Sequence, residues 1–206
     1  MKALIKILTI LLVSLGAVFL FRGSFHLGAK PLPILGSLEP FYLRDQAAQR
    51  VTSDHFSGKV TVVDFIFTRC PGICPLLTQR MAELERRTRD LGSQIQFISI
   101  SVDPENDIPL VLKAYTEKQN LNLMRWKFLT GPLDSIEKVV VEGFRTQMGK
   151  RHIATESGPD LLEITHGENF ILVDPRLNLR LFHKVQTDDD LQVVYKSALR
   201  LIKESF

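Results

Sequence analysis

Two short segments with the composition of buried strands constrain the fold more than any other feature of the sequence. "VTVVDFIF" at 60–67 and "IQFISISVD" at 95–103 are rich in β-branched and aromatic residues, the pattern of strands buried on both faces. Between them, the segment 75–92 begins with proline, ends with glycine and carries its large apolar side chains near one face, which predicts a helix. A buried strand, a helix and a second buried strand predict a parallel α/β unit.

The remaining segments extend this unit into one α/β domain. A weakly alternating stretch that ends at Lys59 predicts a short hairpin before the first buried strand. Thr187 is followed by Asp190 three residues later, which is close to a capping box and predicts the start of the last helix. The pattern therefore predicts a central mixed sheet flanked by helices, with a late antiparallel hairpin as in thioredoxin-like folds. The further predicted elements are helices at 106–120, 133–147 and 187–205, and strands at 126–131, 168–175 and 177–185.

Composition and charge narrow the class of protein. The chain has 206 residues, of which 45% are hydrophobic and 24% charged, which suits one globular domain with an appendage. The formal net charge is only +3 and the basic residues are scattered, so the sequence argues against a nucleic-acid partner.

The first residues predict a membrane anchor. After lysines at positions 2 and 6, an apolar-dominated run extends to Phe21, and the segment from Ala3 spans about 28 Å as a helix, close to the ~30 Å hydrocarbon core. No small-x-small cleavage site follows, so an uncleaved anchor is favoured over a cleaved signal peptide. The positive-inside rule keeps the lysines cytoplasmic, which predicts a single-pass protein of the cell inner membrane with a periplasmic, extracytoplasmic C-terminal domain.

The domain boundaries follow from this assignment, because a stretch rich in glycine, proline and serine separates the apolar run from the α/β domain. We therefore expect an anchor at 1–22, a linker at 23–40 and one domain at 41–206.

The only two cysteines, Cys70 and Cys74, lie in "FTRCPGICP" between the first buried strand and the helix that follows it. Because each precedes a proline, both are expected in loop geometry, with Cys74 next to the helix start. There the helix N-terminus would stabilise a thiolate. The carboxyl end of a central strand is also where open α/β sheets bind their ligands.

Four interpretations of these cysteines remain open from the residues alone. A structural disulfide would close a very small loop and stabilise the chain little. A redox pair suits two neighbouring thiols, although the usual redox signature is C-x-x-C and this is C-x-x-x-C. A metal site would need a third ligand from elsewhere in the chain. The two cysteines could also be unrelated.

Composition does not single out one of the five histidines as that third ligand. His26 lies in the predicted linker and His55 in the early turn, and both are interpreted as surface residues. His183 falls within a predicted strand and is expected to be a packed or edge residue. His152 lies in a polar loop, and His166 precedes the next predicted strand.

Four stretches resemble, in order and spacing, the Sco (SenC) family: "VVDFIFTRCPGICP", "ISISVDPENDIPLVLKAY", "RWKFLTG" and "THGENFILVDPRLNLR". The resemblance covers residues 43–206. It implies a membrane-anchored copper protein with a thioredoxin-like fold, a central mixed sheet flanked by helices and an N-terminal transmembrane helix. It further implies a role in the assembly of cytochrome c oxidase.

The resemblance also implies a site. Its copper ligands fall on Cys70, Cys74 and His166, and Asp103 matches an acidic position that supports the site. Thiolates suit Cu(I) and imidazole suits both copper states, which agrees with that set. The partners it implies are a copper-containing oxidase subunit and, in addition, other copper chaperones or thioredoxin-like reductants.

The chain departs from the family pattern at positions around this site. The family often has Asp at Gly72, Arg at Asn106, Ser at Gly167 and Tyr near Phe170. None of these differences removes a ligand, and together they indicate a divergent member.

Three functions are compatible with these residues. The first is a copper-binding assembly factor that delivers copper to cytochrome c oxidase or matures its copper site. The second is a thiol-disulfide oxidoreductase that acts through Cys70 and Cys74 on partner cysteines, with His166 merely nearby. The third is a peroxidase, in which Thr68 and Arg69 would activate a cysteine.

Overall fold

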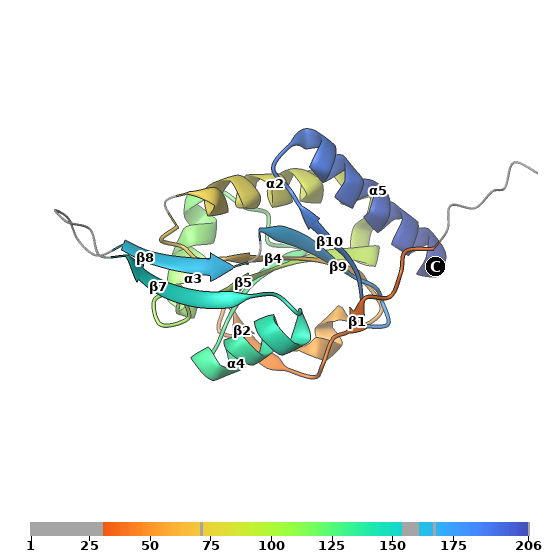
Figure 1. Ribbon diagram of the computed structural model, residues 1–206. Helices are drawn as coiled ribbons and strands as arrows, with labels where there is room; N and C mark the ends of the chain where they lie inside the picture. The colour runs from red at the N-terminus through yellow and green to blue at the C-terminus, as the bar shows by residue number, and fades with distance from the viewer. Residues whose placement is uncertain (1–30, 71, 154–160, 167, 206) are drawn as a thin grey trace, which may run out of the picture. The chain divides into compact units, whose positions relative to one another are not determined.

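The computed structural model describes residues 31–70, 72–153, 161–166 and 168–205. In this part of the chain one mixed sheet has eight strands in the order β1-β10-β9-β4-β5-β6-β2-β3 (Figure 1). Its strands are β1 (Gly36–Ser37), β2 (Tyr42–Asp45), β3 (Arg50–Thr52), β4 (Val60–Ile66), β5 (Ile95–Ser101), β6 (Trp126–Thr130), β9 (Asn169–Val173) and β10 (Asn178–Lys184). A separate two-stranded sheet pairs β7 (Met148–Ile153) with β8 (Leu161–His166).

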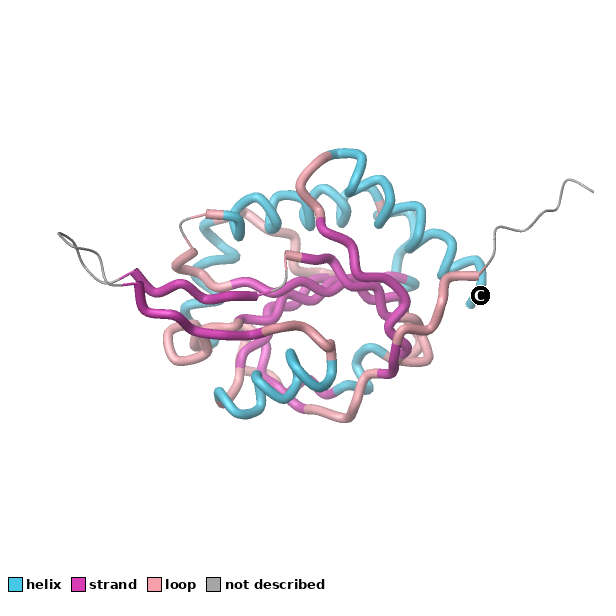
Figure 2. The backbone as a smooth tube through the Cα atoms, in the orientation of Figure 1, coloured by secondary structure: helices cyan, strands magenta, loops and turns pink. Residues whose placement is uncertain are grey.

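Helices cover the sheet on both sides (Figure 2). They are α2 (Ile73–Arg87), α3 (Pro109–Lys118), α4 (Leu133–Glu137) and α5 (Asp188–Ser205), with short helical segments η1 (Ser53–Phe56), η2 (Arg89–Gln94) and η3 (Lys138–Gly143). Helices α2 and α5 lie on one face of the sheet and α4 on the other (Figure 1).

The centre of the sheet is the pair of strands that the sequence predicted. Strands β4 and β5 run parallel, Ile66 is level with Ser101, and every residue of both strands is buried. Strand β6 continues the parallel set, and β9 runs antiparallel on the other side of β4. The carboxyl ends of β4 and β5 and the beginning of β9 therefore meet at one edge of the sheet.

Alternate residues of β4 face different layers. The Phe65 ring makes an edge-on contact with Phe144, which follows η3, at 5.6 Å between centroids. Asp64 consequently points to the opposite face, toward α2 and α3. On that face the Tyr115 hydroxyl of α3 is 2.8 Å from the Thr78 hydroxyl of α2, so the two helices are joined above the carboxyl end of the sheet.

Most predicted elements are confirmed, although the helix predicted at 75–92 ends at Arg87 and is followed by the separate segment η2. The early hairpin, both buried strands, the helix after each of them and the late hairpin are all present. The start of α5 is also confirmed, because the Asp190 N–H donates to the Thr187 hydroxyl at 3.2 Å and the Thr187 N–H donates to the Asp190 carboxylate at 2.8 Å. The segment predicted as one helix at 133–147 is shorter, ending as the π-type segment η3.

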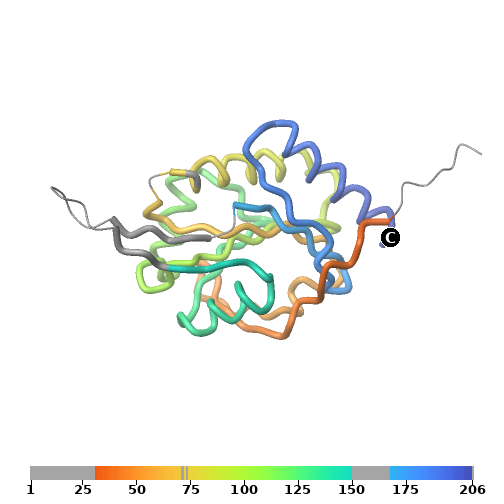
Figure 3. The backbone as a smooth tube through the Cα atoms, in the orientation of Figure 1, coloured from red at the N-terminus to blue at the C-terminus, as the bar shows by residue number. Residues whose placement is uncertain are grey.

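Two elements were not predicted. Gly36–Ser37, within the predicted linker 23–40, form β1 and pair with β10 (Figure 3). Leu38 beside them is buried. Strand β7 falls mostly within the stretch at 149–160 that the sequence predicted as a polar loop, and its partner β8 lies in a stretch for which no element was predicted. Strand β1 is short, and β7 and β8 form an isolated pair, so none of these strands carries the apolar run of a strand buried within a sheet.

The predicted anchor at 1–22 and the first residues of the linker lie outside the described residues. Within the residues that the structure does describe, no helix is both long and apolar enough to cross a membrane.

Candidate functional site

Cys70 and Cys74 lie together at the carboxyl end of β4. Cys70 belongs to the loop after the strand, where its N–H donates to the Phe67 carbonyl oxygen at 3.2 Å, and its side chain is partly exposed. Cys74 lies in the first turn of α2 and is 1% exposed. Both are free thiols, and a hydrogen bond joins their side chains. The described geometry thus contains a dithiol at the ligand-binding edge of the sheet.

Two expectations for Cys74 are wrong. The residue is helical rather than in a loop, because α2 already begins at Ile73. Its thiolate is also not stabilised: burial raises the pKa of the Cys74 thiol, its hydrogen bond with Cys70 raises it further, and the hydrogen bond with the backbone of Phe67 opposes the shift only in part. A helix terminus contributes about 0.3–1 kcal/mol, whereas removing a thiolate from water costs more, so desolvation dominates.

The residues just before Cys70 are held by two buried carboxylates. The Arg69 guanidinium donates to Asp103 at 2.8 Å, and the N–H and hydroxyl of Thr68 donate to Asp107 at 3.0 and 2.5 Å. Asp103, which the resemblance placed in support of the site, therefore contacts the cysteine loop through Arg69. The side chains of Thr68 and Arg69 thus point to carboxylates and not to a cysteine thiol. The peroxidase interpretation, in which they would activate a cysteine, gains no support from this arrangement.

A buried carboxylic acid lies beneath the dithiol, and the sequence analysis did not select it. Asp64 is fully buried in β4, and neither of its carboxyl oxygens forms a well-directed hydrogen bond among the described residues. Burial raises its pKa to about 7, with the nearby Ser99 hydroxyl opposing the shift. The signal was visible in "VTVVDFIF", where one aspartate interrupts an otherwise apolar strand.

Tyr115 belongs to the same buried polar region. Burial raises its pKa, the hydrogen bond with Thr78 opposes the shift, and electrostatic interactions with Asp64 and Cys74 add to it, so that the pKa is about 12. The thiols therefore lie above a low-dielectric interior that raises the pKa of the acidic groups within it.

The backbone brings His166 to the same edge of the sheet. His166 ends β8, opposite Met148 of β7. Strand β9 begins three residues later at Asn169 and runs antiparallel to β4, with Ile171 level with Val63, so its start lies beside the exit of β4. Three residues span at most about 11 Å. The backbone of His166 therefore lies within three residues of the point where β9 begins beside the exit of β4. The His166 side chain is not among the described side chains.

The other histidines lie elsewhere. His183 is a partly buried residue of β10, as expected, with its Nε2 3.5 Å from Asp190. His55 belongs to η1, where burial and then the charge of Lys59 lower its pKa. His152 lies in β7, and His26 is outside the described residues. Among the described side chains, no group of three or more His, Cys, Asp or Glu has a metal-binding arrangement.

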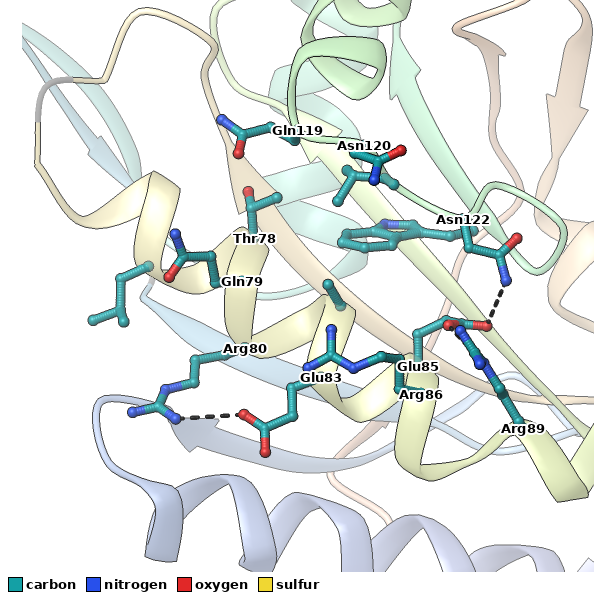
Figure 4. A pocket seen from close by; sticks show the side chains of 14 residues that line it. Thr78, Gln79, Arg80, Glu83, Glu85, Arg86, Arg89, Gln119, Asn120 and Asn122 are labelled. Carbon is teal, nitrogen blue, oxygen red and sulfur yellow. Dashed lines mark hydrogen bonds and ion pairs between the residues drawn. The ribbon is translucent and has the colours of Figure 1, made fainter.

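A polar groove of about 510 Å³ runs along α2 (Figure 4). It is lined by residues other than the two cysteines. Trp126 lies against it, and amide and charged side chains of α2 and of the loop after α3 form its walls. Its buried acidic member, Glu85, is paired with Arg125 at 2.8 Å, and Arg80 pairs with Asp188. Much of the charge in the groove is therefore neutralised by ion pairs within the protein.

Comparison with known proteins agrees with this geometry. The SCO1/SenC family profile matches residues 36–200, which include both cysteines and His166. The SCO1 protein homolog of Bacillus subtilis is 34% identical over 161 residues, which cover 78% of this chain and 80% of that protein.

Solved structures are similar over the same domain. Bradyrhizobium japonicum ScoI, solved with copper bound, has a TM-score of 0.64 and 26% identity and covers 82% of this chain and 99% of that one. BsSco, described as a Sco-family cytochrome c oxidase assembly protein with a disulfide switch, has a TM-score of 0.65 and 30% identity, with coverages of 82% and 98%. The predicted thioredoxin-like α/β fold with a mixed sheet is thereby confirmed.

Proposed function

Because the chain belongs to the SCO1/SenC family, we propose that it is a copper-binding assembly factor that delivers copper to cytochrome c oxidase or matures its copper site. The observation that carries this proposal is the pair of free, hydrogen-bonded thiols of Cys70 and Cys74 at the carboxyl end of β4. Thiolates are soft ligands that suit Cu(I).

The third ligand in this proposal is His166. Two thiolates and one imidazole make a three-coordinate site, which leaves copper open to attack by an incoming ligand. The support from this chain is the backbone path, which ends β8 at His166 and starts β9 beside the exit of β4.

Copper transfer would proceed by ligand exchange. Binding of the ion requires both thiols as thiolates, so loading releases protons. A thiolate of the oxidase subunit then displaces one protein ligand at a time, and the departing cysteine takes up a proton again. The partly exposed Cys70 is the ligand that an incoming group can reach first, since Cys74 is buried.

The proposed location is the extracytoplasmic face of the cell inner membrane, with residues 1–22 as a single-pass anchor. The apolar run after two lysines supports it. At this location the proposed partners are copper-containing oxidase subunits, other copper chaperones and thioredoxin-like reductants.

A second candidate function is thiol-disulfide exchange with partner cysteines. The observation in its favour is again the dithiol, because two free thiols within hydrogen-bonding distance can reduce a target disulfide. In that reaction the thiolate of Cys70 attacks the target, Cys74 resolves the mixed disulfide, and the target leaves with two thiols.

Copper titration of the reduced full-length chain in detergent tests the first function against the second. We expect one tightly bound copper per chain with thiolate-to-copper charge-transfer absorption, and a loss of affinity of at least a hundredfold in His166→Ala. His183→Ala serves as the control and should bind as the wild type does. If His166→Ala keeps both its copper affinity and its dithiol reductase activity, the three-ligand site is rejected and thiol exchange becomes the leading function.

A further inference from the structure

Asp107 makes an unusual set of contacts for a residue outside the proposed ligand set. It lies just before α3 and is fully buried. Its carboxylate accepts three hydrogen bonds: from the Thr68 N–H at 3.0 Å, from the Thr68 hydroxyl at 2.5 Å and from the Ser101 hydroxyl at 2.6 Å. Its own N–H donates to the Asp103 carbonyl oxygen at 2.9 Å.

These contacts join the exits of the two central strands. Thr68 lies two residues beyond the end of β4 and two residues before Cys70, whereas Ser101 is the last residue of β5. A backbone hydrogen bond of 2.9 Å from Val102 to Ile66 brings the same two exits together. Asp107 therefore occupies the point at which the chain leaves the rigid sheet and enters the cysteine loop.

A carboxylate is a costly residue to bury merely to fill space. Desolvating the charge costs several kcal/mol, and apolar residues of similar volume often stabilise such a position as well or better. What three directed hydrogen bonds add is geometry: the Thr68 backbone and side chain are both fixed, so the rotations that would move Cys70 relative to Cys74 are restricted.

We propose that Asp107 is a positioning residue, which holds Thr68 so that the Cys70 thiol is preset toward Cys74. The proposal rests on the function of this dithiol as a copper site or as a redox pair, both of which need the two sulfurs close together. A preset loop reduces the ordering cost of either reaction, so loosening it weakens both copper binding and disulfide formation.

The chain offers a matched control. Asp174 is also a buried carboxylate that accepts hydrogen bonds, from the backbone N–H groups of Arg176 and Asn178 at 2.9 Å and from Arg180 at 2.7 Å. It follows β9, whose last residue, Val173, is level with Thr61. It therefore lies at the opposite end of β4 from the cysteines and serves only the turn into β10.

The experiment compares Asp107→Ala, Asp107→Asn and Asp174→Ala in the full-length chain, at a temperature where each remains folded. Copper affinity is measured by competition with a chromophoric chelator, and charge-transfer absorption is recorded. The Cys70–Cys74 equilibrium is measured in glutathione buffers, where two thiols give two electrons and two protons to glutathione disulfide and form one disulfide bond.

For Asp107→Ala we expect copper affinity to fall at least tenfold, with a shifted charge-transfer band. The disulfide equilibrium constant should fall about tenfold, which is a midpoint potential about 30 mV more positive. Asp174→Ala should leave all three quantities unchanged, and Asp107→Asn, which keeps an acceptor oxygen, should recover part of the loss. If Asp107→Ala does not fold, Thr68→Val, which removes only the hydroxyl bond, should still weaken copper binding severalfold.

Equal copper affinities and potentials for Asp107→Ala and Asp174→Ala would overturn the proposal, as would a Thr68→Val variant with wild-type values. A wild-type chain that binds no copper would contradict the proposed copper function instead. The disulfide equilibrium would then still decide the role of Asp107.

Discussion

Cys70 and Cys74 differ chemically although only three residues separate them. Cys70 is partly exposed in a loop, and Cys74 is buried in the first turn of α2 with its pKa raised by burial and by its hydrogen bond with Cys70. Reactivity of a thiol follows its thiolate fraction and its accessibility, and burial lowers both for Cys74. We therefore expect the Cys70 thiol to react before the Cys74 thiol, because Cys74 is buried.

We expect iodoacetamide to alkylate Cys70 at least ten times faster than Cys74 at pH 8. The rates are obtained by timed quenching and mass spectrometry of the modified peptides. The single variants Cys70→Ser and Cys74→Ser show each rate alone. Equal rates in the two variants would contradict the assignment of Cys70 as the entry thiol.

Asp64 makes stability depend on pH with a sign opposite to that of an ion-paired aspartate. Its folded pKa of about 7 lies above the ordinary value of 3.8, so the folded state binds the proton more tightly. Its contribution is fully present below about pH 4 and is lost as the pH rises through 7, by up to about 4 kcal/mol. Asp64→Asn should lack this loss.

Urea unfolding at pH 5 and at pH 8 measures this difference. The wild-type chain should lose more unfolding free energy between these two pH values than Asp64→Asn does. The exposed substitution Asp134→Asn should keep the wild-type difference. A wild-type chain and an Asp64→Asn variant with the same pH dependence would mean that Asp64 is already ionised in the folded protein.

At the scale of elements, the parts predicted well are those whose own residues carry the signal. The β-branched and aromatic residues of β4 and β5 specify strands buried on both faces, and Pro75 lies in the first turn of the helix between them, although that helix ends at Arg87, before the predicted stop at Gly92. Strand β1 has two residues and depends wholly on β10 for its pairing, and β7 and β8 pair only with each other. Such strands exist through tertiary pairing, which no local pattern encodes.

Helix α5 offers a test of a local signal that the structure confirmed. Thr187 caps its first turn reciprocally with Asp190. Thr187→Ala should lower the free energy of unfolding by about 1 kcal/mol, within the range for helix caps. Ser197→Ala, in the middle of the same helix, should change it by only a few tenths of a kcal/mol. Equal effects of the two substitutions in urea unfolding would argue against the cap.

At the scale of the whole molecule, the sheet topology gathers the candidate site from distant parts of the sequence. The exits of β4 and β5 supply Cys70 and Asp107, and the return of the chain into β9 brings His166 to the same edge. The sequence predicted the cysteine position from local pattern, whereas His166 came only from family resemblance. The role of Asp64 depends on its burial, and that of Asp107 on long-range hydrogen bonds. Sequence spacing specifies neither.

X-ray absorption at the copper edge of the loaded full-length chain tests the central claim most directly. The proposed site predicts a first shell of two sulfur ligands and one imidazole nitrogen for Cu(I), with the imidazole signal lost in His166→Ala and retained in His183→Ala. A first shell without sulfur, or an imidazole signal unchanged in His166→Ala, would contradict the assignment of Cys70, Cys74 and His166 as the copper site.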